Sequence, residues 1–166
     1  RAAGHRVGLL GTIEYRCGAM TFPGERTTPE SSDLQRLLAR MRDLGAWGAV
    51  MEVSSHSLVL HRVAGCEFDV AVFTNLTQDH LDFHGTMDRY AEAKARLFQG
   101  LGKARVKPGV PAAVLNADDP WASFMAQATS ARVLSFGLQA SADLFPQTTA
   151  FDLAGIRASL NSPWGP

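Results

Sequence analysis

The sequence lacks several features that would place it in a class of protein at once. It has only two cysteines, Cys17 and Cys66, which lie far apart and match no zinc-binding spacing. It has neither a signal peptide nor an apolar run of about 18 residues, the length that a membrane-spanning helix needs. We therefore expect a soluble cytoplasmic protein with free thiols and no membrane insertion.

Net charge is absent too, because 16 Lys and Arg balance 16 Asp and Glu. No overall field favours nucleic acid or an anionic membrane, so any anion site must be built locally. The pattern G-x-x-x-x-G-K-[ST] of nucleotide-binding P-loops is missing, since GLGKA at 100–104 lacks the first glycine and the hydroxyl residue. These 166 residues thus contain no P-loop.

Short apolar runs alternate with helical patterns along the chain. We expect strands at 6–13, 49–53, 68–74, 112–116 and 133–137, a loop or hairpin at 15–23, and helices from about 29 to 45, 87 to 98 and 120 to 128. The first of these helices would be capped by Thr27 or Thr28, with Glu30 as a capping-box acid. Beyond Ser141, polar and apolar residues alternate around Gly155. The pattern predicts an α/β fold with a doubly wound, mostly parallel sheet and a small antiparallel β appendage near the C-terminus.

Three polar clusters follow predicted strands directly. They are SSHS after 49–53, NLTQDHLDFHG after 68–74, and ADDP after 112–116. In open α/β sheets, ligands bind outside the carboxyl ends of the strands. We therefore expect the three clusters to line one crevice.

Some of these residues are suited to holding a cation. Glu52 lies in the apolar run AVMEV, so its carboxylate needs an ion-pair partner, water or a bound cation. Asp79, His80, Asp82 and His84 are carboxylates and imidazoles, which can ligate a divalent ion, although such residues also serve as caps in loops. The pattern alone leaves a metal or phosphate site and ordinary loop structure both open.

Other polar residues have plain structural explanations from the pattern. Lys94 is an ordinary solvated helix residue by its spacing, and Arg62 an ordinary surface arginine. Ser54 has no G-x-S-x-G elbow around it, which argues against a serine nucleophile. Asn116 and Asp119 are explained by a strand end and a helix cap, whereas the amides near Thr27 and Thr28 also suit an anion.

Taken together, TTPE, MEVSSHSLVLHRV, FDVAVFTNLTQDHLDFHGTMDRYAEAKARLF and LNADD resemble, in this order, the central domain of MurE-type Mur ligases. The resemblance is strong over residues 1–137 and looser beyond. It implies that residues 1–166 form most of a central domain, and that the P-loop part, the N-terminal UDP-binding domain and the C-terminal domain lie elsewhere in a longer chain. We expect this fragment to be inactive by itself.

The resemblance also implies roles for individual residues. Lys94 matches the family's carbamylated lysine, and Glu52 and His80 match the residues that hold Mg²⁺ with it; Lys94 and His80 would be catalytic. A carbamate replaces the cationic ammonium with an oxygen donor that suits magnesium.

Further matches concern the substrates. Thr27, Thr28, Ser54 and Arg62 match contacts to the UDP-muramoyl dipeptide. Leu60 stands where relatives often have a glutamine, so that contact is not expected here. Asn116 and Asp119 match a segment near the nucleotide.

The implied reaction is a step of peptidoglycan synthesis, hence of cell-wall biogenesis, cell shape and division. ATP would phosphorylate the terminal carboxylate of UDP-MurNAc-L-Ala-D-Glu, and the amine of a diamino acid would attack the acyl phosphate. Three alternatives stay open: another Mur or folylpolyglutamate-type ligase, a noncatalytic binding module with this fold, and a metal hydrolase that uses the His/Asp loop.

Overall fold

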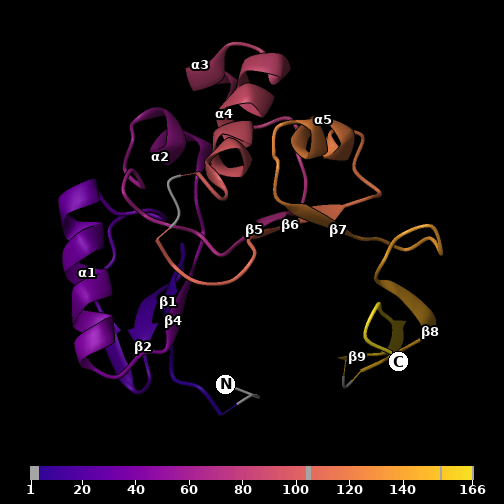
Figure 1. Cartoon of the computed structure of the whole chain (residues 1–166), viewed down its shortest axis with the longest axis horizontal. Coiled ribbons are helices and arrows are strands. Elements are labelled where there is room, and N and C mark those ends of the chain that lie inside the picture. The colour runs from indigo at the N-terminus through magenta and orange to yellow at the C-terminus, as the bar shows by residue number, and fades with distance from the viewer. Residues whose placement is uncertain (1–3, 104–105, 154, 166) are drawn as a thin grey trace. The chain divides into compact units, whose positions relative to one another are not determined.

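The computed structural model describes residues 4–103, 106–153 and 155–165, which divide into two compact units at residues 1–66 and 67–166. Figure 1 shows both units with most of their helices and strands labelled. Among the described residues, no helix is both long and apolar enough to cross a membrane.

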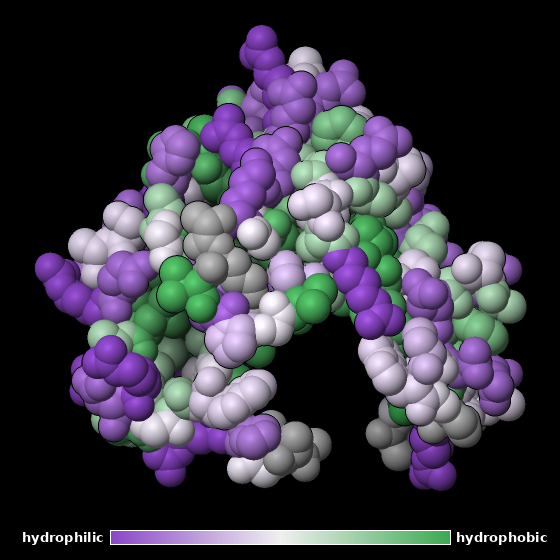
Figure 2. Space-filling model, viewed as in Figure 1, coloured by the Kyte–Doolittle hydropathy of each residue, from purple (hydrophilic) through white to green (hydrophobic). Residues whose placement is uncertain are grey.

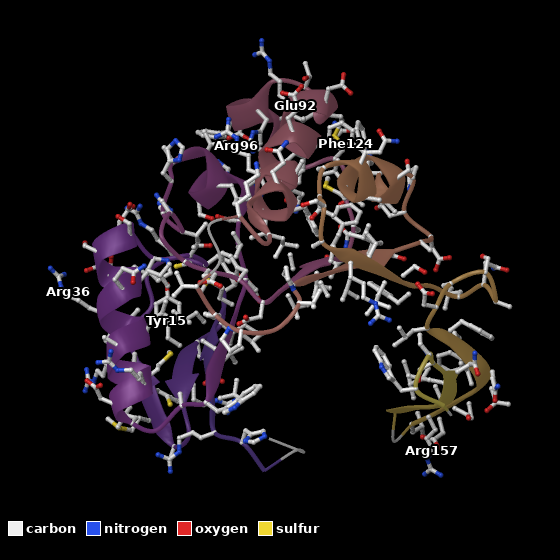
Figure 3. All side chains as sticks on the ribbon, viewed as in Figure 1. Tyr15, Arg36, Glu92, Arg96, Phe124 and Arg157 are labelled. Atoms are coloured by element: carbon white, nitrogen blue, oxygen red, sulfur yellow. The ribbon has the colours of Figure 1, made fainter. Side chains whose placement is uncertain are left out.

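The first unit is a small mixed sheet with one long helix. Its elements are β1 (Val7–Leu10), β2 (Tyr15–Cys17), β3 (Met20–Phe22), α1 (Ser31–Asp43), β4 (Gly48–Met51) and α2 (Ser55–Val59). The strand order is β3-β2-β1-β4; β1 pairs parallel with β4 and antiparallel with β2. Buried residues of α1, Leu34 and Met41, recur at helical spacing and complete a core with Leu10. Tyr15 lies inside this unit, whereas Arg36 points outward from α1 (Figure 3).

The beginning of α1 differs from the prediction. The helix starts at Ser31 with Glu30 as the N-cap, so Thr27 and Thr28 precede the cap and do not serve as caps. The Glu30 side chain makes no capping hydrogen bond because it pairs with arginines instead. The end of α1 is as predicted, since Gly45 follows the C-cap with a φ of 80°.

The second unit contains a parallel sheet in the order β5-β6-β7. Its elements are β5 (Val70–Phe73), α3 (Leu81–His84), α4 (Met87–Gly100), β6 (Ala112–Asn116), α5 (Ala122–Gln127) and β7 (Arg132–Phe136). One apolar cluster joins β5 and β6 to α4 and α5, and it includes Phe73, Phe98, Leu115 and Met125. Thr86 caps α4 as predicted by accepting a hydrogen bond from the Arg89 amide. Hydrophilic side chains gather over α3 and α4 on the side facing solvent (Figure 2).

Two local predictions for this unit need correction. HLDFH was expected to be loop, but Leu81–His84 forms a short helix. Helix α5 starts at Ala122, two positions later than Pro120, because Asp119 first accepts a hydrogen bond from the Trp121 amide in a turn.

The C-terminal appendage is an antiparallel hairpin of β8 (Phe145–Asp152) and β9 (Gly155–Asn161). This hairpin and the α/β class are confirmed. Parallel pairing joins β1 to β4, β5 to β6, and β6 to β7. The predicted loop or hairpin at 15–23 is the β2–β3 hairpin.

Candidate functional site

In the first unit, the Glu52 carboxylate is held just beyond the carboxyl end of β4. Glu52 lies one residue past this strand and is exposed, so the predicted conflict with a dry core does not arise. Its Oε2 accepts hydrogen bonds from the Thr12 amide at 3.1 Å and the Thr12 hydroxyl at 2.6 Å. The Thr12 hydroxyl also lies 3.0 Å from that of Thr27. Glu52 is thus one end of a chain of hydrogen bonds that reaches Thr27.

Thr28 and Ser54 are joined behind this carboxylate. The Thr28 side chain is only 1% exposed, and its hydroxyl donates to the Glu52 carbonyl at 2.9 Å while accepting from the Ser54 amide at 3.1 Å. Ser54 in turn caps α2, because its Oγ accepts from the Ser57 amide at 3.2 Å. These bonds fix the turn between β4 and α2, the segment that carries Glu52.

Two arginines meet at the Glu30 carboxylate. The Arg62 Nη2 lies 2.8 Å from Glu30 Oε1, to which Arg26 also donates. The Arg62 side chain is 13% exposed, and Nη1 is 3.5 Å from the Thr28 carbonyl. Within the described residues, Arg62 Nε is a buried nitrogen with no hydrogen-bond partner. A buried unsatisfied donor costs about 1–3 kcal/mol.

In the second unit, His80 has an unusual backbone. It is the N-cap of α3 and has a φ of 54°, a left-handed conformation that costs a non-glycine residue on the order of 1–3 kcal/mol. Its Nε2 lies 3.4 Å from Asp79 Oδ2, and its ring meets the Tyr90 ring edge-on with 6.1 Å between centroids. Such strain is typical of residues placed for binding or catalysis.

Lys94 lies one helical turn beyond Tyr90 on α4. Its Nζ is 5.2 Å from the centre of the Tyr90 ring, which is itself 6% exposed. Burial lowers the pKa of Lys94 below its ordinary value, and the charges of Asp79 and Asp119 oppose this effect without cancelling it. By contrast, Glu92 and Arg96 of the same helix extend outward (Figure 3). Lys94 is therefore half-buried beside Tyr90, which corrects the simple pattern-based view of a solvated lysine.

Asn116 and Asp119 connect the loops that follow β5 and β6. Asn116 Nδ2 donates to the Thr74 carbonyl at 2.8 Å, and its Oδ1 accepts from the Asp118 amide at 3.0 Å. Asp119 accepts from the Leu76 amide at 2.9 Å and from the Trp121 amide at 2.8 Å. Two of the three polar clusters therefore meet, as predicted for strand ends of one parallel sheet.

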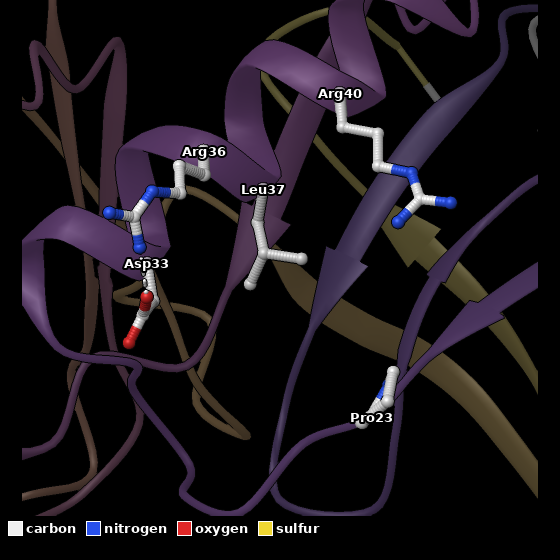
Figure 4. Close-up of a pocket in the computed structure, with 5 residues that line it drawn as sticks. All are labelled: Pro23, Asp33, Arg36, Leu37 and Arg40. Carbon is white, nitrogen blue, oxygen red and sulfur yellow. Dashed lines mark hydrogen bonds and ion pairs between the residues drawn. The ribbon is translucent and has the colours of Figure 1, made fainter.

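A separate hollow of about 290 Å³ lies beside α1 (Figure 4). It is lined by Pro23, Asp33, Arg36, Leu37 and Arg40, and an Arg36–Asp33 ion pair of 2.9 Å lies at its edge. No predicted site residue lines this hollow.

The structure thus gathers the predicted residues into two sets, one per unit. Sequence reasoning missed Thr12, which no motif marked, and the pairing of Glu30 with Arg62. No group of three or more His, Cys, Asp or Glu suited to a metal occurs among the described residues. The predicted ligand set of Glu52, His80 and modified Lys94 contains only two residues of these types. The convergence of Glu52 with His80 and Lys94 stays a prediction.

Comparison with known proteins gives one consistent family. Residues 1–165 match the family described as Mur ligase middle domain. A UDP-N-acetylmuramoyl-L-alanyl-D-glutamate–2,6-diaminopimelate ligase of Geobacter metallireducens is 50% identical over 163 residues, which is 98% of this chain and 32% of that protein.

Solved structures agree with this match. A structure of a UDP-N-acetylmuramoyl-L-alanyl-D-glutamate–2,6-diaminopimelate ligase superposes with a TM-score of 0.84 at 35% identity, covering 99% of this chain and 33% of that one. MurF from Acinetobacter baumannii has a TM-score of 0.65 at 16% identity, covering 99% of this chain and 32% of its own, and shows the fold alone. The chain therefore spans about a third of the length of the relatives it matches.

Proposed function

Because the chain belongs to the Mur ligase family through its middle domain, we propose that the whole protein is an ATP-dependent ligase of peptidoglycan synthesis. It joins a diamino acid to UDP-MurNAc-L-Ala-D-Glu in the cytoplasm, and residues 1–166 supply most of its central domain. Flanking domains of the same chain complete the sites for UDP, ATP and the amino acid. The observation that carries this proposal is the 50% identity to a diaminopimelate ligase over 98% of the chain.

The reaction requires two anions, a substrate carboxylate and a triphosphate, to approach each other. Bound Mg²⁺ lowers their repulsion and stabilises the charge that develops during phosphoryl transfer. The proposed ligands are Glu52, His80 and carbamylated Lys94. Glu52 fits this role because Thr12 orients its carboxylate through Oε2, and carboxylate oxygens are suitable ligands for magnesium. The strained backbone of His80 supports a role for its ring.

The surroundings of Lys94 fit a carbamate. Carbamylation needs a neutral amine, whose nitrogen forms a bond to the carbon of CO₂ and releases a proton to solvent. Burial favours the neutral amine because it lowers the Lys94 pKa. The product is a carboxylate-like group on the same helical face as Tyr90.

The remaining proposed contacts are divided by substrate. Thr27, Thr28, Ser54 and Arg62 bind the UDP-muramoyl dipeptide. The Arg62 guanidinium supports such a role because its ion pair with Glu30 and its contact with the Thr28 carbonyl hold it beside the Thr27–Thr28 segment. The proposed nucleotide contacts are Asn116 and Asp119, which hold the loops after β5 and β6 in place.

Substitution of Lys94 in the full-length protein tests this function. Wild-type protein should join 2,6-diaminopimelate to UDP-MurNAc-L-Ala-D-Glu with release of ADP and phosphate. Lys94→Ala should abolish ligation, and short carboxylates such as acetate or formate should restore part of it. Lys103→Ala, which changes an exposed lysine, is the control.

The outcomes separate the two parts of the proposal. Failure of the wild-type protein to ligate any diamino acid would reject the ligase assignment. Unchanged ligation by Lys94→Ala would reject the role of Lys94 alone. A ¹³C resonance for a lysine carbamate under ¹³CO₂, absent from Lys94→Ala, would identify the modification directly.

A further inference from the structure

We infer that Thr12 is a positioning residue that links the Glu52 carboxylate to the Thr27 hydroxyl and makes Thr27 a hydrogen-bond acceptor toward the substrate. This inference rests on the proposed roles of Glu52 and Thr27. Thr12 lies in the loop after β1, two residues beyond Leu10. Its amide and its hydroxyl both bind the same oxygen of Glu52, at 3.1 and 2.6 Å.

The backbone around Thr12 is built for this contact. The Gly11 amide donates to the Glu14 carbonyl at 3.2 Å, and the Glu52 amide donates to the Leu10 carbonyl at 2.9 Å. A side chain at Gly11 would bring a Cβ within 3.1 Å of Glu52 Oε1. A glycine at this position therefore lets the carboxylate lie close to the loop, and both ends of the Thr12–Glu52 contact are held by backbone bonds.

The direction of the hydrogen bonds follows from the donor count. A hydroxyl has a single proton, and an ionised carboxylate only accepts. Thr12 therefore gives its proton to Glu52, and in the 3.0 Å contact between the two threonines it must accept from Thr27. The Thr27 hydroxyl proton is therefore already donated to Thr12. Toward any other group, the Thr27 oxygen can act only as a hydrogen-bond acceptor. A substrate group that meets it must be a donor, such as an amide N–H or a sugar hydroxyl.

This arrangement links the proposed metal ligand Glu52 to the proposed substrate contact Thr27. Loss of the Thr12 hydroxyl removes one of two bonds that orient Glu52 and frees the Thr27 proton. Loss of a partner that orients a metal ligand typically weakens metal binding about 10- to 100-fold. Because the Thr12 amide remains in any substitution, we expect the lower end of that range.

The test uses Thr12→Val, Thr12→Ala and Thr12→Ser in the full-length protein. Mn²⁺ serves as the probe, and its binding is followed by electron paramagnetic resonance with ADP present, so that no turnover is needed. Thr12→Val and Thr12→Ala should weaken Mn²⁺ binding about tenfold, and Thr12→Ser should restore it to within about twofold. Thr21→Val, at an exposed threonine of β3, is the matched control and should change nothing.

Glu52→Gln in the same assay separates this inference from the proposed function. If Glu52→Gln leaves Mn²⁺ binding unchanged, the metal role of Glu52 is wrong. If Glu52→Gln weakens binding but Thr12→Val and Thr12→Ala do not, only the role of Thr12 is wrong. Failure of Thr12→Ser to restore binding would likewise overturn the argument from the hydroxyl.

Coupling to the substrate gives a second readout. The KM for UDP-MurNAc-L-Ala-D-Glu should rise in both Thr12→Val and Thr27→Val. Because the two hydroxyls form one chain, the double variant should raise KM less than the product of the two single effects. Strictly multiplicative effects would contradict the linkage.

Discussion

Removal of the Thr28 hydroxyl should loosen the turn between β4 and α2. Thr28→Val keeps the shape of the side chain but deletes the group that donates to the Glu52 carbonyl and accepts from the Ser54 amide. Since the side chain is 1% exposed, water cannot replace either bond without local opening. Two net hydrogen bonds of about 1 kcal/mol each correspond to about 2 kcal/mol. Because 1.4 kcal/mol is a factor of ten, local opening should become about 30-fold more frequent.

Hydrogen exchange of the full-length protein measures this opening directly. Mass spectrometry of peptides that cover residues 49–58 should show faster exchange in Thr28→Val, with the Ser54 amide affected most. Thr27→Val is the matched control, because the Thr27 hydroxyl contacts that of Thr12, whereas the Ser54 amide donates to the Thr28 hydroxyl. Exchange at Ser54 within about twofold of wild type in Thr28→Val would refute the reasoning.

Three further variants test the second unit and the core of the first unit. Burial lowers the pKa of Lys94 in the folded protein below its ordinary value of 10.5. The unfolded chain therefore binds the proton more readily than the folded protein does. As a result, the free energy of unfolding rises with pH between the pKa of the folded state and 10.5. In CO₂-free buffer, Lys94→Met should abolish that rise and increase the thermal midpoint at neutral pH; an undiminished rise would contradict this. Asp119→Ala should cost about 2 kcal/mol in denaturant unfolding, because the Leu76 and Trp121 amides lose their acceptor, and no loss would count against it. Gly8→Ala should cost about 1–3 kcal/mol, since a Cβ there collides with the buried Met41 sulfur; an unchanged midpoint would show that Met41 moves freely.

Local patterns in the sequence were enough to predict most of the elements. The spacing of Leu34 and Met41 predicted α1, and both side chains are buried. The apolar run AAVLN coincides with β6, and the alternation around Gly155 became the β8–β9 hairpin. Periodicity works here because each element buries one face, and the residues on that face are close in sequence.

Helix starts were predicted less well, because contacts between distant residues decided them. Glu30 has the sequence signature of a capping-box acid, yet its carboxylate pairs with Arg62, which comes from beyond α2. An ion pair with a partly buried arginine competes with a local cap, and only the folded chain brings that arginine near. HLDFH is a different case, because the residue with positive φ, His80, directly precedes a short helix that the composition of this segment did not indicate.

The sequence by itself determined the α/β class, the family resemblance and the residues that carry the proposed chemistry, because these depend on local periodicity and on residue identity. Tertiary structure alone decided how those residues are held. Thr12 and Glu52 are 40 positions apart, and only the parallel pairing of β1 with β4 places them in contact. Likewise, the lowered pKa of Lys94 comes from burial on the inner face of α4. Hydrogen-bond direction and desolvation depend on neighbours in space, and no local pattern in the chain specifies them.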